Sequence, residues 1–213
     1  MRKINKGCEP DSLHTWKRKN PNKKYSELDS NVRQDIRLAC AKEQYFLCAY
    51  CCKEISGTND DTMNEHVEPQ AQASDKTLDF NNIVASCTTK GQCDDKHGSK
   101  ILPLTPLMDE CETELEFRLN GHVRGLTERA KEMIALLNLD NRKLQEARKQ
   151  QIDNILLAEG VGNPIEIDDE ELILAVLDDI YRADEQGKML PFMPAVANAV
   201  RSWLANYRQP ETT

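Results

Sequence analysis

This sequence has few aromatic residues, no long apolar run and no export signal. Aromatic residues make up only 5% of the 213 residues. No stretch of about 18 consecutive apolar residues occurs, which argues against a membrane-spanning helix. The first residues, Met1 to Gly7, carry basic side chains with no apolar core behind them, unlike a signal peptide. We therefore expect a cytoplasmic protein.

Cysteine, in contrast, is abundant, with eight residues. Without an export signal, this number favours metal binding over a disulfide scaffold. Five of the eight lie between positions 48 and 93. The other three, Cys8, Cys40 and Cys111, need no role beyond that of small apolar residues.

The net charge of −8 at first argues against binding to nucleic acid, but the charge is unevenly distributed. Residues 1–24 contain eight lysines and arginines against two acidic residues, a net +6, so the rest of the chain carries −14. A basic arm on an acidic body can contact phosphates. The candidate nucleic-acid-binding residues are Lys17, Arg18, Lys19, Lys23 and Lys24. The alternative is a solvated basic tail without a ligand.

The first hundred residues predict an arm, one helix and a small irregular unit. Prolines and asparagines in residues 1–30 break any periodicity, which indicates an irregular arm. A helix is expected within residues 25–44, capped by Ser30 or Asn31. From about residue 48 to residue 100, short segments with turn residues fit a minimal ββα unit that relies on metal for its stability.

Beyond two closely spaced prolines in residues 102–106 the pattern becomes helical. We expect a first domain of residues 1–105 and a helical subdomain of residues 106–213. Its four expected helices begin after Thr127, at about Arg142, at Asp168 or Asp169, and at Pro191 or Pro194, with Gly187 ending the third. The fold class is therefore α+β, and docking to a partner is the hypothesis for the helical part.

Two cysteine pairs predict one structural zinc site. Cys48-Ala-Tyr-Cys51 forms a turn that presents two thiolates to one ion. Cys87 and Cys93 complete a tetrahedral set, although five intervening residues make this second loop longer. Cys52 is an alternative ligand.

The residues between and after the cysteine pairs suit phosphodiester hydrolysis. This reaction needs a base to activate water and a cation for the charge that grows on the phosphate. His66 is the candidate base, because an imidazole titrates near neutral pH. Glu65 and His97 are candidate ligands for a divalent ion, Mg²⁺ or Mn²⁺, and Asn82 is placed to orient the base.

Other residues compete for these roles. Lys96, Lys100 or Asp95 is an alternative to His97 as the third site residue. Glu68 is a further candidate carboxylate, although a solvent-facing position is the favoured interpretation. The two remaining histidines, His14 and His122, are interpreted as surface residues.

Four motifs in this region resemble the Cys-rich branch of HNH endonucleases: Cys-x-x-Cys, Glu-His-x-x-Pro, Asn-Ile-x-x-x-Cys and a trailing Cys. Further segments are similar to the retron-associated and Septu-type HNH proteins of bacterial anti-phage defence: Met1 to Gly7 with Glu9-Pro10, Glu43-Gln44 before Leu47 to Cys51, Leu137 to Asp140, and Leu144 to Arg148. The resemblance covers most of the chain and weakens after about residue 160.

The resemblance implies a ββα-metal nuclease fold, a divalent catalytic ion and an ATPase partner of the SMC/ABC type. In retron systems it also implies control by a reverse transcriptase with its reverse-transcribed DNA and RNA. By motif, His66 takes the base position, Asn82 the central position and His97 the third. Two departures are the glutamate at position 65, where aspartate is commoner, and the long spacing between Cys87 and Cys93.

The leading hypothesis is thus a toxic nuclease effector that cuts DNA, or RNA such as tRNA. The first alternative is a zinc-stabilised adaptor that binds nucleic acid or an ATPase without cutting. A thiol-based redox sensor is a second alternative, and it requires reversible loss of zinc on oxidation.

Overall fold

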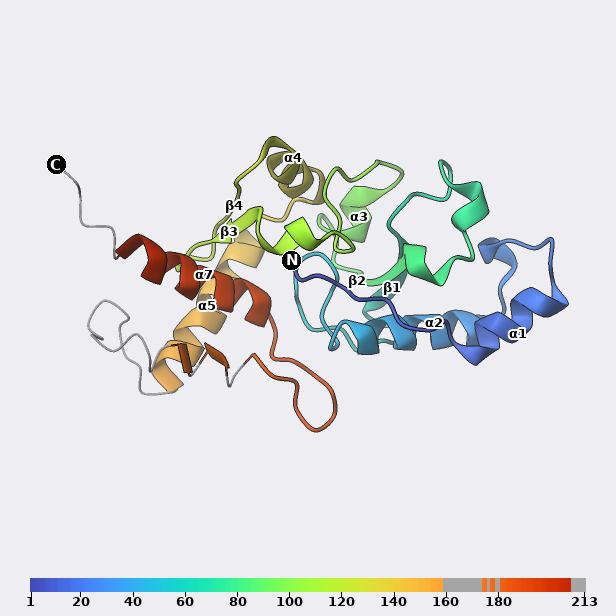
Figure 1. The fold of residues 1–213 in the computed structure, drawn as a ribbon, viewed down its shortest axis with the longest axis horizontal. Coiled ribbons are helices and arrows are strands. Elements are labelled where there is room, and N and C mark those ends of the chain that lie inside the picture. The colour runs from blue at the N-terminus through green and yellow to red at the C-terminus, as the bar shows by residue number, and fades with distance from the viewer. Residues whose placement is uncertain (159–173, 176, 179–180, 208–213) are drawn as a thin grey trace.

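The computed structural model describes residues 1–158, 174–175, 177–178 and 181–207. It is a mixed α and β fold with two small antiparallel sheets. Helices α1 (Asp11–Lys19) and α2 (Ser30–Glu43) lie on one side of the N-terminus (Figure 1). Helices α5 (Arg142–Ala158) and α7 (Met193–Tyr207) lie on the other side, and α4 (Glu128–Leu137) precedes α5 in the chain (Figure 1). None of the described helices is both long and apolar enough to cross a membrane.

The N-terminal arm is more ordered than its sequence predicts. Its middle forms helix α1, in which Leu13 and Trp16 are buried at helical spacing. These two apolar side chains pack α1 onto α2, and this tertiary contact outweighs the prolines on either side. Helix α2 begins at Ser30, and Asp29 precedes it as the N-cap residue rather than Ser30 or Asn31.

A ββα unit follows α2. Strand β1 (Thr62–His66) pairs antiparallel with β2 (Ile83–Cys87), in a register that places His66 opposite Ile83. Helix α2 packs against this hairpin, and the short helix α3 (Asp94–His97) comes after it in the chain. Short 3-10 helices connect these elements and the next ones, at Tyr25–Glu27, Ser74–Lys76, Phe80–Asn82 and Asp109–Glu112.

The second half is helical as predicted, with one addition. Thr127 caps α4 by accepting a hydrogen bond from the backbone N–H of Ala130 at 3.3 Å, and α5 begins at Arg142. The addition is a hairpin of β3 (Leu115–Phe117) and β4 (Val123–Gly125), which sequence periodicity missed because each strand has only three residues. The expected start of the third helix, at Asp168 or Asp169, lies outside the described residues, and Gly187 lies in a turn closed by its hydrogen bond to the carbonyl of Asp184 instead of at a helix end.

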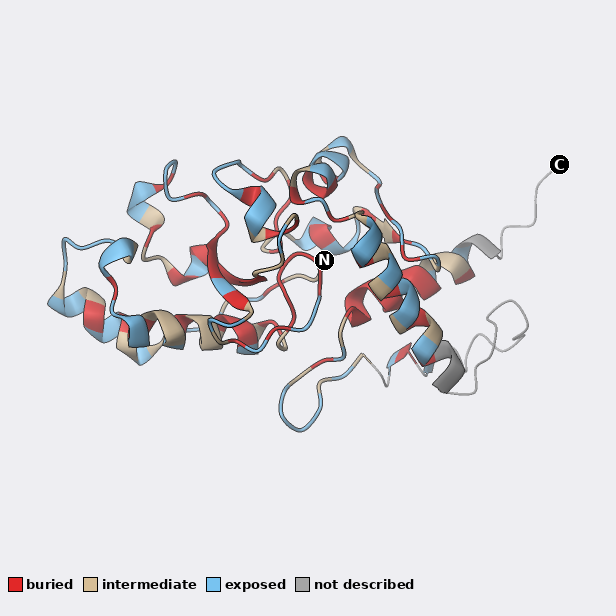
Figure 2. Ribbon diagram, turned by 180° about the vertical axis from the view of Figure 1, so that it is seen from behind, coloured by how far each residue is buried: buried red, intermediate tan, exposed pale blue. Residues whose placement is uncertain are grey.

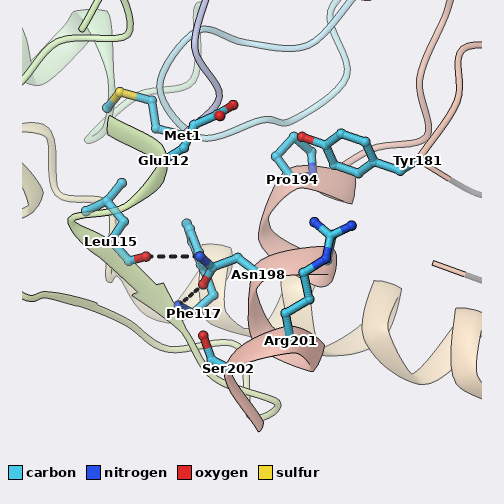
Figure 3. Close-up of a pocket in the computed structure, with 10 residues that line it drawn as sticks. Met1, Glu112, Leu115, Phe117, Tyr181, Pro194, Asn198, Arg201 and Ser202 are labelled. Carbon is cyan, nitrogen blue, oxygen red and sulfur yellow. Dashed lines mark hydrogen bonds between the residues drawn. The ribbon is translucent and has the colours of Figure 1, made fainter. Parts of the chain in front are cut away.

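Helix α7 closes the second half against this hairpin. The Asn198 side chain accepts a hydrogen bond from the backbone N–H of Phe117 at 2.7 Å and donates one to the carbonyl of Leu115 at 3.1 Å (Figure 3). A cavity of about 220 Å³ lies beside this contact, lined also by Arg201 and Tyr181 (Figure 3). Figure 2 shows buried residues concentrated on the β1–β2 hairpin and on α7, and both contribute to one hydrophobic core cluster. The domain boundary at residue 105 stays a prediction.

Candidate metal centre and active site

Four buried cysteines converge at the base of the ββα unit. One ligand atom from each of Cys48, Cys51, Cys87 and Cys93 lies within 4.8 Å of the others. The first pair stands on the turn after α2, and the second pair stands at the end of β2 and just before α3. A tetrahedral zinc ion with Zn–S bonds of about 2.3 Å places its sulfurs about 3.8 Å apart. The observed separation of 3.9 Å between the Cys51 and Cys87 sulfurs fits that geometry.

The electrostatics of the cluster also favour a cation. Hydrogen bonds from the Cys48, Cys51 and Cys93 thiols hold the pKa of Cys87 well below its ordinary value. Hydrogen bonds with Cys48 and Cys87 raise the pKa of Cys51, and hydrogen bonds with Cys48, Cys51 and Cys87 raise that of Cys93, because a thiol that donates to a neighbouring thiolate holds its proton more tightly. The four thiols therefore conflict over ionisation. A divalent ion removes this conflict by neutralising several thiolates at once. The four cysteines can therefore hold a metal ion such as zinc.

Cys52 lies outside this cluster. Its backbone adopts a positive φ of 62°, and its carbonyl accepts a hydrogen bond from the backbone N–H of Phe192 at 2.8 Å. Burial raises the pKa of its thiol. The structure thus separates Cys52 from the four converging sulfurs and selects the set predicted from spacing.

Backbone and amide groups surround the sulfurs. The backbone N–H of Cys87 donates to the Cys48 sulfur at 3.3 Å, and the Gln92 side-chain amide lies 3.7 Å from the Cys51 sulfur. Asn141 donates to the Gln92 side-chain oxygen at 3.3 Å, and Asn138 donates to the carbonyl of Gly91 at 2.7 Å. The loop between α4 and α5 is therefore bound directly to the second cysteine loop.

Arg148 brings a buried positive charge to the same region. Its side chain is 1% exposed, and it donates to the carbonyls of Gly121 and Leu139 at 3.1 and 2.6 Å. Burial lowers the pKa of Arg148, and the negative charges of nearby groups, with Cys51 first among them, oppose this effect. Within the described residues, these hydrogen bonds of Arg148 go to backbone carbonyls and not to a carboxylate. A zinc ion with four thiolates carries a net charge of −2, which Arg148 is placed to offset.

We expect Arg148→Met to weaken zinc retention by about 10- to 100-fold, as loss of an outer-shell partner does at other metal sites. Arg148→Lys keeps the charge and should retain most of the affinity. The measurement is zinc transfer to a chromogenic chelator, with Lys149→Met, an exposed neighbour, as control. Equal zinc loss from the Met and Lys variants would assign Arg148 to packing instead of charge.

His66 ends strand β1 with its tautomer defined. Its Nε2 donates to the carbonyl of Thr77 at 2.9 Å, so the neutral ring carries its lone pair on Nδ1. The Gln70 amide donates to that Nδ1 at 3.2 Å, and the Tyr25 ring packs edge-on at 4.7 Å. Burial lowers the pKa of His66, so the ring is neutral at pH 7. An imidazole in this state can accept a proton through Nδ1 once Gln70 moves aside.

Asn82 holds the chain just beyond His66. Its side-chain oxygen accepts from the backbone N–H of Glu68 at 2.8 Å, and its amide donates to the carbonyl of Glu68 at 3.0 Å. With these two bonds the Asn82 side chain satisfies both the N–H and the C=O of Glu68, as a neighbouring strand would, and fixes the path of the backbone after β1. Asn82 therefore supports the backbone next to His66 and does not touch the ring through any hydrogen bond in the described structure.

Glu65 and His97 meet on the opposite face of β1, since successive side chains of a strand alternate. The Glu65 carboxylate bonds Nδ1 of His97, whose Nε2 donates to the carbonyl of Lys100 at 2.7 Å. Burial disfavours a charged His97, but Glu65 outweighs burial and raises the pKa of His97. When neutral, His97 directs the Nδ1 lone pair at a carboxylate, and a shared cation would stabilise that arrangement.

Asp94 is a third candidate ligand, which the sequence analysis did not identify. Burial, followed by the adjacent Glu65 carboxylate, raises its pKa to about 7. A divalent ion bound between the Glu65 and Asp94 carboxylates would relieve their repulsion. The three groups are less tightly gathered than the cysteines, which form the only such group converging within 4.8 Å among the described residues. The position of Asp94 directly after Cys93 is the sequence feature that could have identified it as a candidate ligand.

Tyr50, between the first two cysteines, connects the metal cluster to this acidic group. Its hydroxyl donates to Glu65 at 3.4 Å, and its ring lies 6.2 Å from that of His97. The alternatives to His97 point elsewhere: Lys96, Lys100 and Asp95 are exposed, and Glu68 pairs with Lys76 in solvent. The remaining two histidines, His14 and His122, are exposed as predicted.

The five basic candidates lie on α1 and the turn after it, and all except the half-buried Lys17 are exposed. Lys17 pairs with Glu9 and lies 3.5 Å from the carbonyl of Leu78, next to the Thr77 that binds His66. Arg18 and Lys19 form no ion pair within the described ranges. The basic surface therefore borders the loop that packs on the candidate base.

Comparison with known protein families and curated proteins does not assign the chain to a family. No model of a known protein family matches the chain, and no curated protein matches it.

Proposed function

We propose that this chain is a metal-dependent endonuclease of the HNH type, which hydrolyses phosphodiester bonds in DNA or RNA. The observation that carries the proposal is the end of strand β1. There, a histidine whose Nδ1 lone pair accepts a hydrogen bond from Gln70 stands beside a glutamate–histidine pair, on a hairpin that four cysteines join to α3. Base and cation site are the two components that phosphodiester hydrolysis requires.

The chain's own residues suggest how the reaction proceeds. Nδ1 of His66 accepts a proton from the attacking water, while the bond to Thr77 keeps the ring oriented. Glu65 and His97, with Asp94, would hold Mg²⁺ or Mn²⁺, which supplies positive charge for the phosphate and the leaving oxygen. Glu65 and His66 lie on opposite faces of β1. The scissile phosphate must therefore lie across the end of the strand, where it can contact both the base and the bound ion.

The biological setting is proposed from the resemblance of the sequence. The chain acts as the toxic effector of a retron- or Septu-type anti-phage system. An SMC/ABC-type ATPase and, in retron systems, a reverse transcriptase with its DNA and RNA are its partners. The helical half is the proposed docking region.

The test is cleavage by the purified chain, alone and with the proposed SMC/ABC-type ATPase partner. Plasmid DNA and total RNA are incubated with Mg²⁺, Mn²⁺ or EDTA. Cleavage that EDTA abolishes supports the nuclease, and the substrate that is cut identifies its class.

A zinc-stabilised adaptor is the second candidate. It is favoured by the shielding of His66, which is only 6% exposed and whose Nδ1 is occupied by Gln70. An adaptor would bind nucleic acid or the ATPase in this assay and cut neither substrate.

The basic surface makes a separate prediction. Arg18→Ala combined with Lys19→Ala should weaken binding to nucleic acid about tenfold and reduce the slope of log K against log salt by about 2, the loss of two phosphate contacts. The matched control is Arg142→Ala with Lys143→Ala, an exposed pair of the same composition on α5. Equal effects of the two double variants would show that net charge alone, and not α1, attracts nucleic acid.

A further inference from the structure

An open cleft of about 570 Å³ adjoins the candidate active site. One wall comes from residues 67–82, between β1 and β2, and the other from residues 101–108, after α3. Its apolar lining consists of Val67, Pro69, Ile101, Leu102, Leu107 and Met108. Ile101 is 66% exposed, the most exposed of the large apolar side chains in the described structure.

Both walls continue directly from the candidate catalytic residues. Val67 follows His66, and its backbone N–H bonds the carbonyl of Asn82 at 3.0 Å. Ile101 follows Lys100, whose carbonyl accepts from Nε2 of His97. The cleft therefore lies where chain segments from the base and from the proposed metal ligands come together, which favours an occupant that is part of the substrate.

The lining matches the chemistry of a nucleobase. Aliphatic side chains can cover the faces of a planar ring, while the amides of Gln72 and Asn81 and the hydroxyl of Thr105 can meet its polar edge. The Gln72 amide also donates to the carbonyl of Ser99 at 2.7 Å and so ties the two walls together. At the rim, Lys76 pairs with Glu68 in solvent, a weak pair that a phosphate can displace.

A base within a duplex is stacked and paired, so it cannot enter this cleft without leaving the helix. We propose that the cleft receives an unpaired nucleobase next to the scissile phosphate, so that unpaired stretches of nucleic acid are the substrate class. This inference rests on the proposed nuclease function and specifies its substrate.

The first experiment measures binding without cleavage. Full-length protein with His66→Ala is titrated by fluorescence anisotropy against a short DNA or RNA oligonucleotide, its duplex, and single strands with one abasic nucleotide. We expect single strands to bind about tenfold more tightly than the duplex, and one abasic position to lose much of this gain. Ile101→Ala should remove most of the preference. Leu126→Ala, an exposed leucine just after β4, should not.

The second experiment measures cleavage of the same oligonucleotides by the wild type. Cleavage of single strands and not of duplex, sensitive to Ile101→Ala, supports the inference. Cleavage of the duplex at a rate equal to that of single strands, dependent on His66, would support the nuclease function and contradict the proposed role of the cleft. Base-dependent binding with no cleavage of any oligonucleotide would instead support the proposed role of the cleft and contradict the nuclease function. Loss of ATPase binding in Ile101→Ala with nucleic-acid binding unchanged would reassign the cleft to the partner protein.

Discussion

A His66→Ala variant should remain folded and lose phosphodiester cleavage by about 10²- to 10⁴-fold, the usual contribution of a general base. The reason is the defined tautomer, because Nε2 is committed to Thr77 and only Nδ1 can accept a proton from water. The rate of cleavage is measured with saturating Mg²⁺ or Mn²⁺, and the melting temperature is measured on the same sample.

Because His66 is buried, its removal also costs packing, so a second variant is needed. His66→Gln retains an amide that can donate to Thr77 but has no basic nitrogen, and it should be equally inactive. His122→Ala, an exposed histidine paired with Asp140, is the control and should cleave normally. If both His66 variants are folded and keep full cleavage, His66 is not the base, and the mechanism proposed here is wrong.

Replacing Cys51 by serine should release zinc and destabilise the fold by about 4 kcal/mol or more, because zinc binding at a structural site is itself folding free energy. The four sulfurs connect the turn after α2 to the end of β2 and the start of α3. Without them, this part of the structure has two five-residue strands and a four-residue helix. Such short elements do not hold together by packing alone. Zinc content by mass spectrometry and the free energy of unfolding are the measurements.

Two other buried cysteines provide matched controls. Cys52→Ser and Cys111→Ser each remove a buried thiol outside the cluster, and both should keep full zinc content with a smaller loss of stability. Zinc loss in Cys52→Ser equal to that in Cys51→Ser would return Cys52 to the ligand set. Full zinc content in Cys51→Ser would contradict the four-sulfur site.

The four converging cysteines were predictable as a candidate metal site because cysteine spacing carries chemical information without tertiary structure. A Cys-x-x-Cys turn presents two thiolates locally, and only a second pair was needed to complete the set. The start of α4 was equally predictable, because Thr127 is an N-cap residue whose hydrogen bond depends only on residues next to it in the chain. The arm was misread because the burial of Leu13 and Trp16 against α2 is a long-range effect that no local pattern records.

The sequence by itself determined each of the two cysteine pairs, the ββα order around them and the helices α4 and α5, because each depends mainly on residues close together in the chain. Only the tertiary structure decided that His97, and not Lys96 or Lys100, meets Glu65, and that Asp94 and Tyr50 join them. It also decided that Gln70 covers the candidate base. These contacts join side chains from separate strands, turns and helices, and their distances arise only when the chain packs.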